Sequence, residues 1–366
     1  MTTYNVRELI VDHWASDNLW PVTEDTDFSK VSKWRSRQTY TRGNDTLYVE
    51  SHRYDPYSAV ARTGHLDLPV PYKNRDATKE PHQDVMDAMV EDLKGYAKQG
   101  FTVIRWRHAW FCFEPVTRHL GRMFNLVALD FGDDVPGSTE VKVEPVIYNF
   151  DAVIHQMFTF DYATGKKVGD LYSKDYGVDW VRHALLGPST PVARAKPAPE
   201  VERDVLLTFV GAMGMQNPGR VAFLKDLNYR AHELEGVTKL HGSCHRDGYL
   251  PNEELAPLYR RSRFGVNYPA SSLWNGRCFD LFLTGCVQIC PDKWDELPVY
   301  GFKPWEHFIP FNGTVDSLLY ELEALEGTPP PGMAQKAREQ AVRMLAEHST
   351  AKVTEDMLWE HLEHIA

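Results

Sequence analysis

An arginine and an aspartate stand three residues apart in the stretch SSLWNGRCFDLFLTGCVQIC, residues 271–290. We expect Asn275 to begin a turn, which places Arg277 in the first turn of a short helix. Asp280 then lies one helical step further on the same face. The pair can be a surface ion pair, which contributes little to stability. Alternatively, Arg277 binds a diphosphate while Asp280 accepts hydrogen bonds from ribose hydroxyl groups.

A glycine-rich turn precedes this stretch in LLTFVGAMGMQNPGR, residues 206–220. An apolar strand is predicted to run into Gly211, and a helix to begin near Arg220. Backbone N–H groups and the positive end of a helix can face a phosphate at such a turn, although a tight turn with no ligand gives the same pattern. The glycines do not follow GxGxxG, which argues against a nicotinamide or flavin enzyme.

A third group of polar residues, His241, Cys244 and His245, follows a predicted strand that ends at His241. A metal site is one interpretation of these three side chains. Their spacing matches no standard zinc signature, and no fourth ligand is in view. We therefore predict ordinary loop residues here and no metal site.

Short β-rich apolar runs alternate with longer helical patterns along the whole chain. Residues 81–99 predict an amphipathic helix, with apolar residues at helical spacing. Strand–helix alternation favours a mostly parallel sheet covered on both faces, hence an α/β fold. The predicted strands of the first half are Leu9–Val11, Thr46–Glu50, Phe101–Trp106, Leu126–Asp130 and Ala152–Gln156.

The composition changes in GPSTPVARAKPAPEV, residues 187–201, where Pro, Ala and Ser prevent both helix and central strand. A new strand–turn–helix pattern begins directly afterwards with Val205–Val210. A chain of 366 residues suits two domains. We predict an N-terminal domain over 1–190, a linker over 191–203, a second domain over 204–345 and a C-terminal helix over 346–366 that can pack back on the first domain.

The second half is predicted to continue with the same alternation. Its helices are expected over Arg220–Leu227, from Pro251, and over Asp316–Leu325, and Gly285 is expected to end the helix that carries Arg277. The strands expected between them are Phe264–Tyr268, Val287–Cys290 and His307–Pro310.

The net charge of -11 argues against a surface that wraps nucleic acid indiscriminately. A local basic groove is still compatible with it. Residues 30–42 combine lysines and arginines with Trp34 and Tyr40, and residues 105–108 read Arg-Trp-Arg-His. Such a pattern can follow a phosphate backbone and stack its bases, or it can be a solvated loop with long side chains.

The five cysteines form no CxxC pair, which suits a reducing compartment. The N-terminal stretch MTTYNVRELIVDHW has no signal-peptide core, and no apolar run is long enough to cross a bilayer. We expect a cytoplasmic protein, in the host cytoplasm if a phage encodes it. The sequence does not fix its oligomeric state.

The order of these pieces resembles the C-terminal half of GT-B glycosyltransferases, in particular the spore-maturation (CgeB-like) group. The matching pieces are Phe209-Val210-Gly211, Arg220, the run over 248–267, and Asn275–Asp280 with Gly285, within about residues 204–325. The resemblance implies two Rossmann-like domains that face each other across a cleft. It also implies a nucleotide-diphosphate sugar, of the UDP or GDP type, as donor substrate, with no other cofactor and no metal.

The resemblance assigns roles to the donor residues. Gly211 and Arg220 would approach the donor phosphates, and Arg277 would neutralise the diphosphate leaving group. Asp280 would hold the donor ribose, although the family usually has Glu there, so the ribose contact can be shifted. The predicted donor-binding set is completed by His241 and Asn275.

In the GT-B plan, the acceptor and the catalytic base come from the first half. A base must lie within hydrogen-bond reach of the acceptor hydroxyl. We predict Asp134 as the base and His13 as the second candidate. Other acidic or histidine residues at predicted strand ends are Asp12, His108, Asp133 and His155, and the predicted acceptor-binding residues are Trp34, Arg35, Arg107 and His108.

Three functions stay open at this point. The first is a glycosyltransferase that acts on a glycan, protein or small molecule. The second is a phage-type enzyme that adds sugar to hydroxymethylated pyrimidines in DNA, which the basic aromatic segments favour. The third is a non-catalytic protein that binds sugar nucleotides on the same fold.

Overall fold

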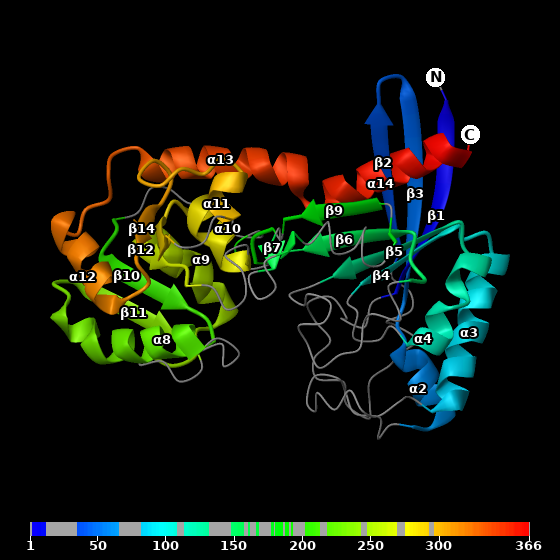
Figure 1. The fold of residues 1–366 in the computed structure, drawn as a ribbon, viewed down its shortest axis with the longest axis horizontal. Coiled ribbons are helices and arrows are strands. Elements are labelled where there is room, and N and C mark those ends of the chain that lie inside the picture. The colour runs from blue at the N-terminus through cyan, green and yellow to red at the C-terminus, as the bar shows by residue number, and fades with distance from the viewer. Residues whose placement is uncertain are drawn as a thin grey trace. The chain divides into compact units, whose positions relative to one another are not determined.

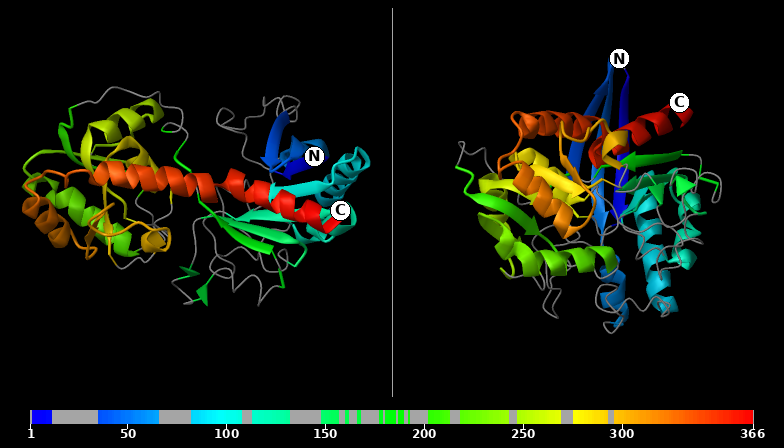
Figure 2. Two further views of the ribbon diagram at one scale, coloured as in Figure 1. Left: turned by 90° about the horizontal axis from the view of Figure 1, so that it is seen from above. Right: turned by 60° about the vertical axis from the view of Figure 1, so that its left-hand side comes forward.

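The computed structural model of the chain is shown in Figures 1 and 2. It describes residues 2–11, 35–65, 82–107, 113–131, 148–156, 160–161, 166–167, 177–178, 180–185, 187–189, 192, 202–212, 218–242, 247–268, 275–292 and 296–365.

Contacts divide the chain into two compact units. The first comprises residues 1–183 together with 353–366, and the second comprises residues 184–352. The sequence predicts the corresponding boundaries at residues 190 and 345. Each unit is built on its own β-sheet.

The first unit is built on a seven-stranded sheet of order β2-β3-β1-β4-β5-β6-β9 (Figure 1). The pairs β1–β3, β1–β4, β4–β5 and β5–β6 are parallel, and β2 pairs with β3 in the antiparallel direction. The strands are β1 Thr3–Val11, β2 Arg35–Arg42, β3 Asp45–Tyr54, β4 Val103–Arg107, β5 Leu126–Phe131, β6 Ala152–Gln156 and β9 Trp180–Ala184. A separate two-stranded ribbon joins β7 Phe160–Asp161 and β8 Lys166–Lys167.

The helices of this unit follow the apolar patterns of the sequence. In α3, Gln83–Lys98, Val85, Met89 and Leu93 are fully buried at helical spacing. The predicted helix over 81–99 is therefore correct to within two residues. The shorter helices are α2 Tyr57–Thr63, α4 Glu114–Thr117 and the 3-10 turn η2 Leu120–Arg122.

The C-terminal helix α14, Thr350–Ile365, lies against the strands of the first sheet (Figure 2). The ring of Trp359 meets that of Tyr4 from β1 edge to face, with centroids 5.9 Å apart. Arg42 of β2 donates to Glu363 at 2.9 Å and lies over the Trp359 ring. These contacts place the last helix in the first unit, although the chain reaches it only after the second.

The second unit contains a five-stranded sheet in which every pair of neighbours is parallel. Its order is β11-β10-β12-β13-β14. The chain therefore passes from β10 to β11 on one side and then returns to place β12 on the other side of β10. In open parallel sheets, ligands bind at the carboxyl ends of the strands where the order reverses in this way. The strands are β10 Val205–Val210, β11 Val237–His241, β12 Ser262–Val266, β13 Val287–Pro291 and β14 Ile309–Phe311.

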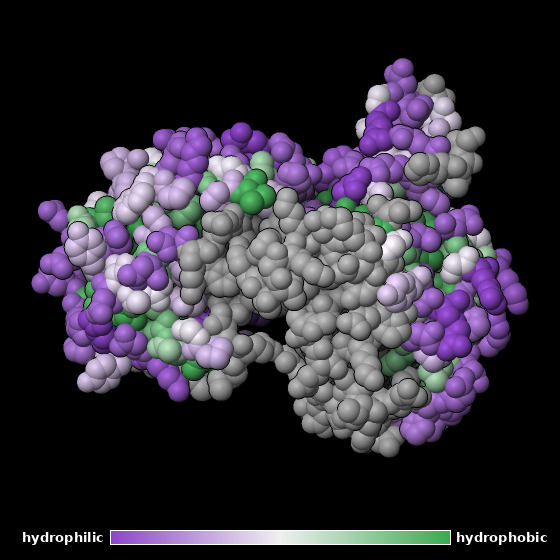
Figure 3. All heavy atoms as spheres, in the orientation of Figure 1, coloured by the Kyte–Doolittle hydropathy of each residue, from purple (hydrophilic) through white to green (hydrophobic). Residues whose placement is uncertain are grey.

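Helices cover both faces of this sheet. Apolar residues of α8, Pro218–Arg230, and α12, Val315–Ala324, pack on one face. Residues of α9, Asn252–Arg261, and α10, Gly276–Thr284, form a separate cluster with Val192 and Cys286. The remaining elements are η4 Ala231–Glu233, α11 Glu296–Val299 and α13 Met333–His348. In Figure 3, hydrophilic side chains gather over the outer surfaces of α3 and α13.

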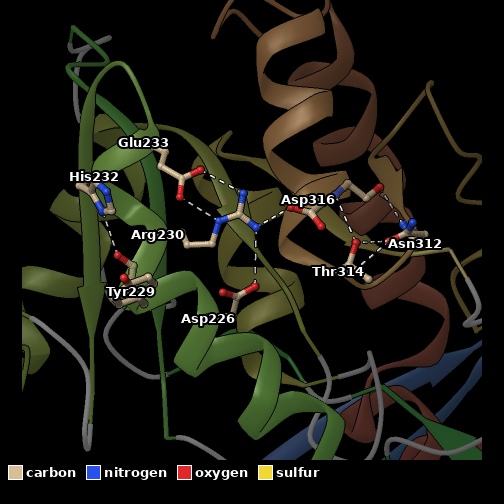
Figure 4. Close-up of polar contacts among 9 residues, drawn as sticks. Asp226, Tyr229, Arg230, His232, Glu233, Asn312, Thr314 and Asp316 are labelled. Atoms are coloured by element: carbon tan, nitrogen blue, oxygen red, sulfur yellow. Dashed lines mark hydrogen bonds and ion pairs between the residues drawn. The ribbon is translucent and has the colours of Figure 1, made fainter.

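An exposed ion-pair cluster joins the end of α8 to the start of α12 (Figure 4). Arg230 donates to Glu233 at 2.9 Å and to Asp316 at 2.5 Å, and its Nη1 lies 3.9 Å from Asp226. Thr314 caps α12 by accepting a hydrogen bond from the Ser317 amide. These contacts fasten two helices on one face of the sheet. No described helix is both long and apolar enough to span a membrane.

Candidate functional site

The carboxyl end of β10 brings the backbone close to charged side chains. Gly211 follows the strand with a φ of 155°, and its amide donates to the His241 carbonyl of the neighbouring β11 at 3.0 Å. A Cβ atom at this position would collide with Nη2 of Arg277 and would lie 3.6 Å from Nη2 of Arg220. A side chain at this position would therefore displace the Arg277 guanidinium, whereas Arg220 lies at an ordinary contact distance. The positive φ also favours glycine here.

Arg277 stands at the start of α10, as the sequence predicted. Asn275 caps this helix, since its side-chain oxygen accepts from the Cys278 amide, and Gly285 ends it in the left-handed conformation. Nε of Arg277 donates to the Val210 carbonyl at 2.8 Å, and its Nη1 is buried without a hydrogen-bond partner in the described part of the chain. The guanidinium thus points at the end of β10.

Arg220 reaches the same place from the first turn of α8. It is 3% exposed, and it donates to the carbonyls of Tyr268 and Ala212 at 2.6 Å each. These carbonyls belong to the residues that follow β12 and β10. Arg220 therefore lies at the point of the sheet where the strand order reverses.

The two guanidinium groups share one environment and raise its positive potential. Burial and the neighbouring Arg277 lower the pKa of Arg220 to about 9, so it is still mainly protonated at neutral pH. Burial also lowers the pKa of Arg277, an effect that the Tyr259 and Asp280 side chains oppose. No carboxylate lies within ion-pair distance of Arg277 among the residues that the structure describes. An anionic ligand would relieve this repulsion.

Asp280 lies on the same helix but is turned to a different partner. It is 3% exposed, and its Oδ1 accepts a hydrogen bond from the Ser189 amide at 2.8 Å. The start of α10 also approaches this segment, because a Cβ atom added at Gly276 would lie 3.7 Å from the Ser189 nitrogen. The surface ion pair that the sequence left open is therefore wrong. The ribose contact stays a prediction, and ribose would have to share this carboxylate with Ser189.

We expect Asp280→Asn to stabilise the second unit at pH 8. Burial raises the pKa of Asp280 to about 6, well above its ordinary 3.8. The charged, buried carboxylate therefore destabilises the folded state fully above about pH 6, and this destabilisation disappears as the pH falls towards 4. Asparagine can still accept the Ser189 hydrogen bond without a charge. Urea unfolding should show a gain of about 1–3 kcal/mol at pH 8, shrinking towards pH 4. A less stable variant at pH 8 would contradict this assignment.

Asn275 and His241, the other predicted donor residues, lie at the same edge of the sheet. Besides capping α10, Asn275 donates from Nδ2 to Oδ1 of the buried Asn267 at 3.2 Å, so it links the helix to the end of β12. His241 ends β11, and its Nδ1 is buried without a hydrogen-bond partner among the described residues. The structure thus brings five of the six predicted donor residues to the ends of β10 and β11 and the starts of α8 and α10, whereas Asp280 lies one turn further along α10 and contacts Ser189.

Other residues around the arginines were not predicted. Phe209 lies under both guanidinium groups, with its ring centroid 5.4 Å from Arg220 and 4.4 Å from Arg277. Ser189 belongs to the Pro- and Ala-rich segment that the sequence indicated only as a linker. Phe209 was part of the quoted FVG pattern, but a ring in an apolar strand gives no signal beyond packing.

The described residues of the basic aromatic segment, 105–107, lie mostly within the first unit. Arg105 forms a buried network in which Nε donates to Glu8 at 2.8 Å and Nη1 lies 3.4 Å from Asp130. Trp106 is 1% exposed and belongs to the core of the first unit. The interpretation of these two residues as nucleic-acid contacts is therefore wrong. Their carboxylate and core partners come from other strands, which a local pattern does not reveal.

Arg107 ends β4 with its side chain 40% exposed and its Nε 3.6 Å from Asp130. Arg35 begins β2, an antiparallel strand that the sequence did not predict because its residues are mostly polar. His155 is fully buried, with its ring 5.8 Å from that of His183, which does not suit a base that must reach an acceptor. The other first-half candidates lie outside the described residues: Asp12, His13, Trp34, His108, Asp133 and Asp134.

The described residues contain no group of three or more His, Cys, Asp or Glu side chains arranged to hold a metal ion. Cys244 and His245 lie outside them. Metal independence stays a prediction that rests on the two arginines.

Residues 220–358 match a family described as "Glycosyl transferase-like". This supports the enzyme class that the sequence predicts, glycosyltransferase. The family is broader than the spore-maturation group, so membership of that group stays a prediction. A comparison with curated proteins gave no significant match.

Several solved structures share the fold of the whole chain. An α,α-trehalose-phosphate synthase (UDP-forming) from Burkholderia vietnamiensis has a TM-score of 0.52 and 11% identity, covering 98% of this chain and 100% of the other. A related synthase from Burkholderia xenovorans, in complex with glucose-6-phosphate, has a TM-score of 0.51 and 10% identity, with coverages of 98% and 100%. Sucrose-phosphate synthase from Thermosynechococcus elongatus has a TM-score of 0.54 and 13% identity, with coverages of 87% and 84%. These neighbours are GT-B glycosyltransferases, which confirms the predicted α/β fold with two Rossmann-like units.

Proposed function

We propose that this chain, whose fold is GT-B and whose residues 220–358 match a glycosyl transferase-like family, transfers a sugar from a nucleoside-diphosphate sugar to a hydroxyl acceptor. One observation carries the proposal. Arg220 and Arg277 converge on Gly211 at the carboxyl ends of a parallel sheet, where its strand order reverses. This is a site for the diphosphate of the donor.

The arrangement suits the charge that develops during transfer. The bond between the anomeric carbon and the β-phosphate oxygen breaks, and its electron pair leaves with the diphosphate. The acceptor oxygen forms the new bond to the anomeric carbon and gives its proton to a base. Preorganised cations beside the departing phosphate stabilise that charge without reorganising. Arg277 is the principal group in this role because its Nη2 lies closest to the place that a side chain would take at Gly211.

Each donor residue has a distinct part in this proposal. Arg220, fixed by two carbonyls, supplies a second positive charge beside the diphosphate. Gly211 contributes space rather than its amide, since its N–H already donates to His241. His241 offers a buried ring nitrogen at the same edge. For the base we keep Asp134, with His13 as the second candidate.

For the donor and acceptor we propose a UDP-sugar and a small sugar hydroxyl. The support is the fold shared with a UDP-forming trehalose-phosphate synthase and with a synthase bound to glucose-6-phosphate. Glycans and proteins remain further acceptors to test. The DNA alternative loses the support of Arg105 and Trp106, which are buried within the first unit.

The test is a panel of UDP- and GDP-sugars against sugar phosphates, free sugars, glycans and hydroxymethylated DNA, with products read by mass spectrometry. Transfer to a sugar hydroxyl is the expected result. Transfer to DNA alone would contradict the proposed sugar acceptor and would show that the chain is a DNA glycosyltransferase. Binding of nucleotide sugars with neither transfer nor hydrolysis would contradict the enzymatic proposal and favour a binding protein.

Removal of divalent ions is expected to leave transfer unchanged. Two guanidinium groups already supply positive charge at the diphosphate, so the site has no need of a cation there. Initial rates should agree within about twofold before and after dialysis against EDTA, because the proposed cations are covalent parts of the chain. Activity that disappears in EDTA and returns with magnesium would show that the arginines are insufficient.

A further inference from the structure

One aromatic ring lies against both donor-site arginines. Phe209 is the fifth residue of β10 and is fully buried. The guanidinium carbon of Arg277 lies 4.4 Å from its ring centroid, and that of Arg220 lies 5.4 Å away. Both distances are within the range of a cation–π interaction. The ring therefore contacts the two cations that converge on Gly211.

The other contacts of these arginines fix them in position without neutralising their charge. Arg277 donates to the Val210 carbonyl and forms a hydrogen bond with the uncharged Tyr259 side chain. Arg220 donates to the carbonyls of Tyr268 and Ala212. The Asp280 carboxylate, one turn along α10 from Arg277, accepts instead from the Ser189 amide. Three of the groups that contact the arginines come from one continuous stretch of β10 and the turn after it. They are the Phe209 ring and the carbonyls of Val210 and Ala212.

An aromatic face attracts a cation through its quadrupole and carries no net charge. A carboxylate in the same place would also hold the arginines, but it would compete with a phosphate for their hydrogen bonds. Two like charges so close together repel each other, and in a desolvated site the attraction of a ring is stronger than at an exposed surface. A ring shared between them therefore opposes the repulsion while both charges stay available to a ligand.

We propose that Phe209 is a positioning residue, whose ring holds Arg220 and Arg277 together over Gly211 so that both face the diphosphate of the donor. This inference rests on the proposed function, because it needs a diphosphate at that site. It assigns to a core phenylalanine a role in ligand affinity that its burial alone does not require.

The test compares two substitutions of the same kind, Phe209→Leu and Phe264→Leu. Phe264 lies on the adjacent strand β12, opposite Leu207, is also fully buried in the same apolar cluster, and has no described arginine over its ring. Both variants lose a comparable amount of packing. Binding of UDP, GDP and inorganic pyrophosphate to each folded protein is measured by titration calorimetry, together with donor and acceptor KM.

For Phe209→Leu we expect a Kd that is about tenfold or more higher for the diphosphate that the wild-type chain binds most tightly. The donor KM should rise by a similar factor, and the acceptor KM should not change. For Phe264→Leu we expect less than about a threefold change in either, since loss of packing alone lowers the folded fraction and not the affinity of folded molecules. Phe209→Met, which fills the space without a ring, should behave like Phe209→Leu and replaces it if that variant does not fold.

The outcomes separate this inference from the proposed function. If the wild-type chain binds a diphosphate and both Phe209 variants bind it as tightly as Phe264→Leu does, Phe209 is a packing residue only and the inference is overturned, while the donor site stands. If the wild-type chain binds none of the three diphosphates, the proposed function falls and this inference with it.

Discussion

Arg277→Ala is expected to lower the rate of sugar transfer by about 100- to 1,000-fold, the usual effect of removing one preorganised donor from a charge-stabilising site. The side chain projects past the end of β10 towards Gly211, and its Nη1 has no partner among the described residues. Its Nε donates to the Val210 carbonyl, and the side chain also forms a hydrogen bond with that of Tyr259, so two contacts orient the group. Steady-state kcat and donor KM, with circular dichroism to verify folding, check this prediction.

Two variants serve as controls for Arg277→Ala. Arg277→Lys keeps the charge but loses the fork of donors, so we expect partial activity. Arg203→Ala removes an arginine that also donates to backbone carbonyls in the second unit, those of Ser262 and Thr284, away from Gly211. It should lower thermal stability and leave the activity of folded molecules unchanged. A folded Arg277→Ala enzyme with turnover near that of the wild type would remove the basis of the donor assignment.

Gly211→Ala should be nearly as damaging as loss of Arg277, with transfer reduced by about 100-fold. The added methyl group would collide with Arg277 Nη2, and the backbone at φ 155° disfavours any side chain. The arginine must therefore move away from the place proposed for the diphosphate. Donor KM and kcat measure the result.

Gly332→Ala is a control that introduces backbone strain without a collision between side chains. Gly332 has a φ of 75° before α13, and no atom lies within 4 Å of the place that an added methyl group would take, so only backbone strain is introduced there. That strain costs about 1–3 kcal/mol and should lower stability without changing the kinetics of folded enzyme. Equal loss of activity in both variants would mean that the loss in Gly211→Ala reflects general destabilisation and not displacement of Arg277.

The second unit was largely predictable because its signals are local. The apolar run of β10, the Gly285 that ends α10 and the residues of α8 each lie within the element they define. Once these elements alternate in sequence, a parallel sheet brings the strand ends to one edge. This topology agrees with the family resemblance, which placed Gly211, Arg220 and Arg277, far apart in the chain, at one site.

The features that could not be predicted depend on long-range contacts. Asp280 meets Ser189, 91 residues away in sequence, so its local spacing from Arg277 suggested a partner that it does not have. Arg105 appears in a basic segment but is paired with Glu8, 97 residues away on another strand. The polar strand β2 has no apolar alternation and exists through its antiparallel pairing with β3.

A crystal structure of the protein with UDP in the presence of EDTA tests the central claim most directly. We predict that the diphosphate lies at the end of β10, with phosphate oxygens within hydrogen-bond distance of the Arg277 guanidinium and near Arg220, and with no metal ion between them. A diphosphate bound elsewhere, or one that appears only when a divalent ion is supplied and coordinates it, would contradict the account.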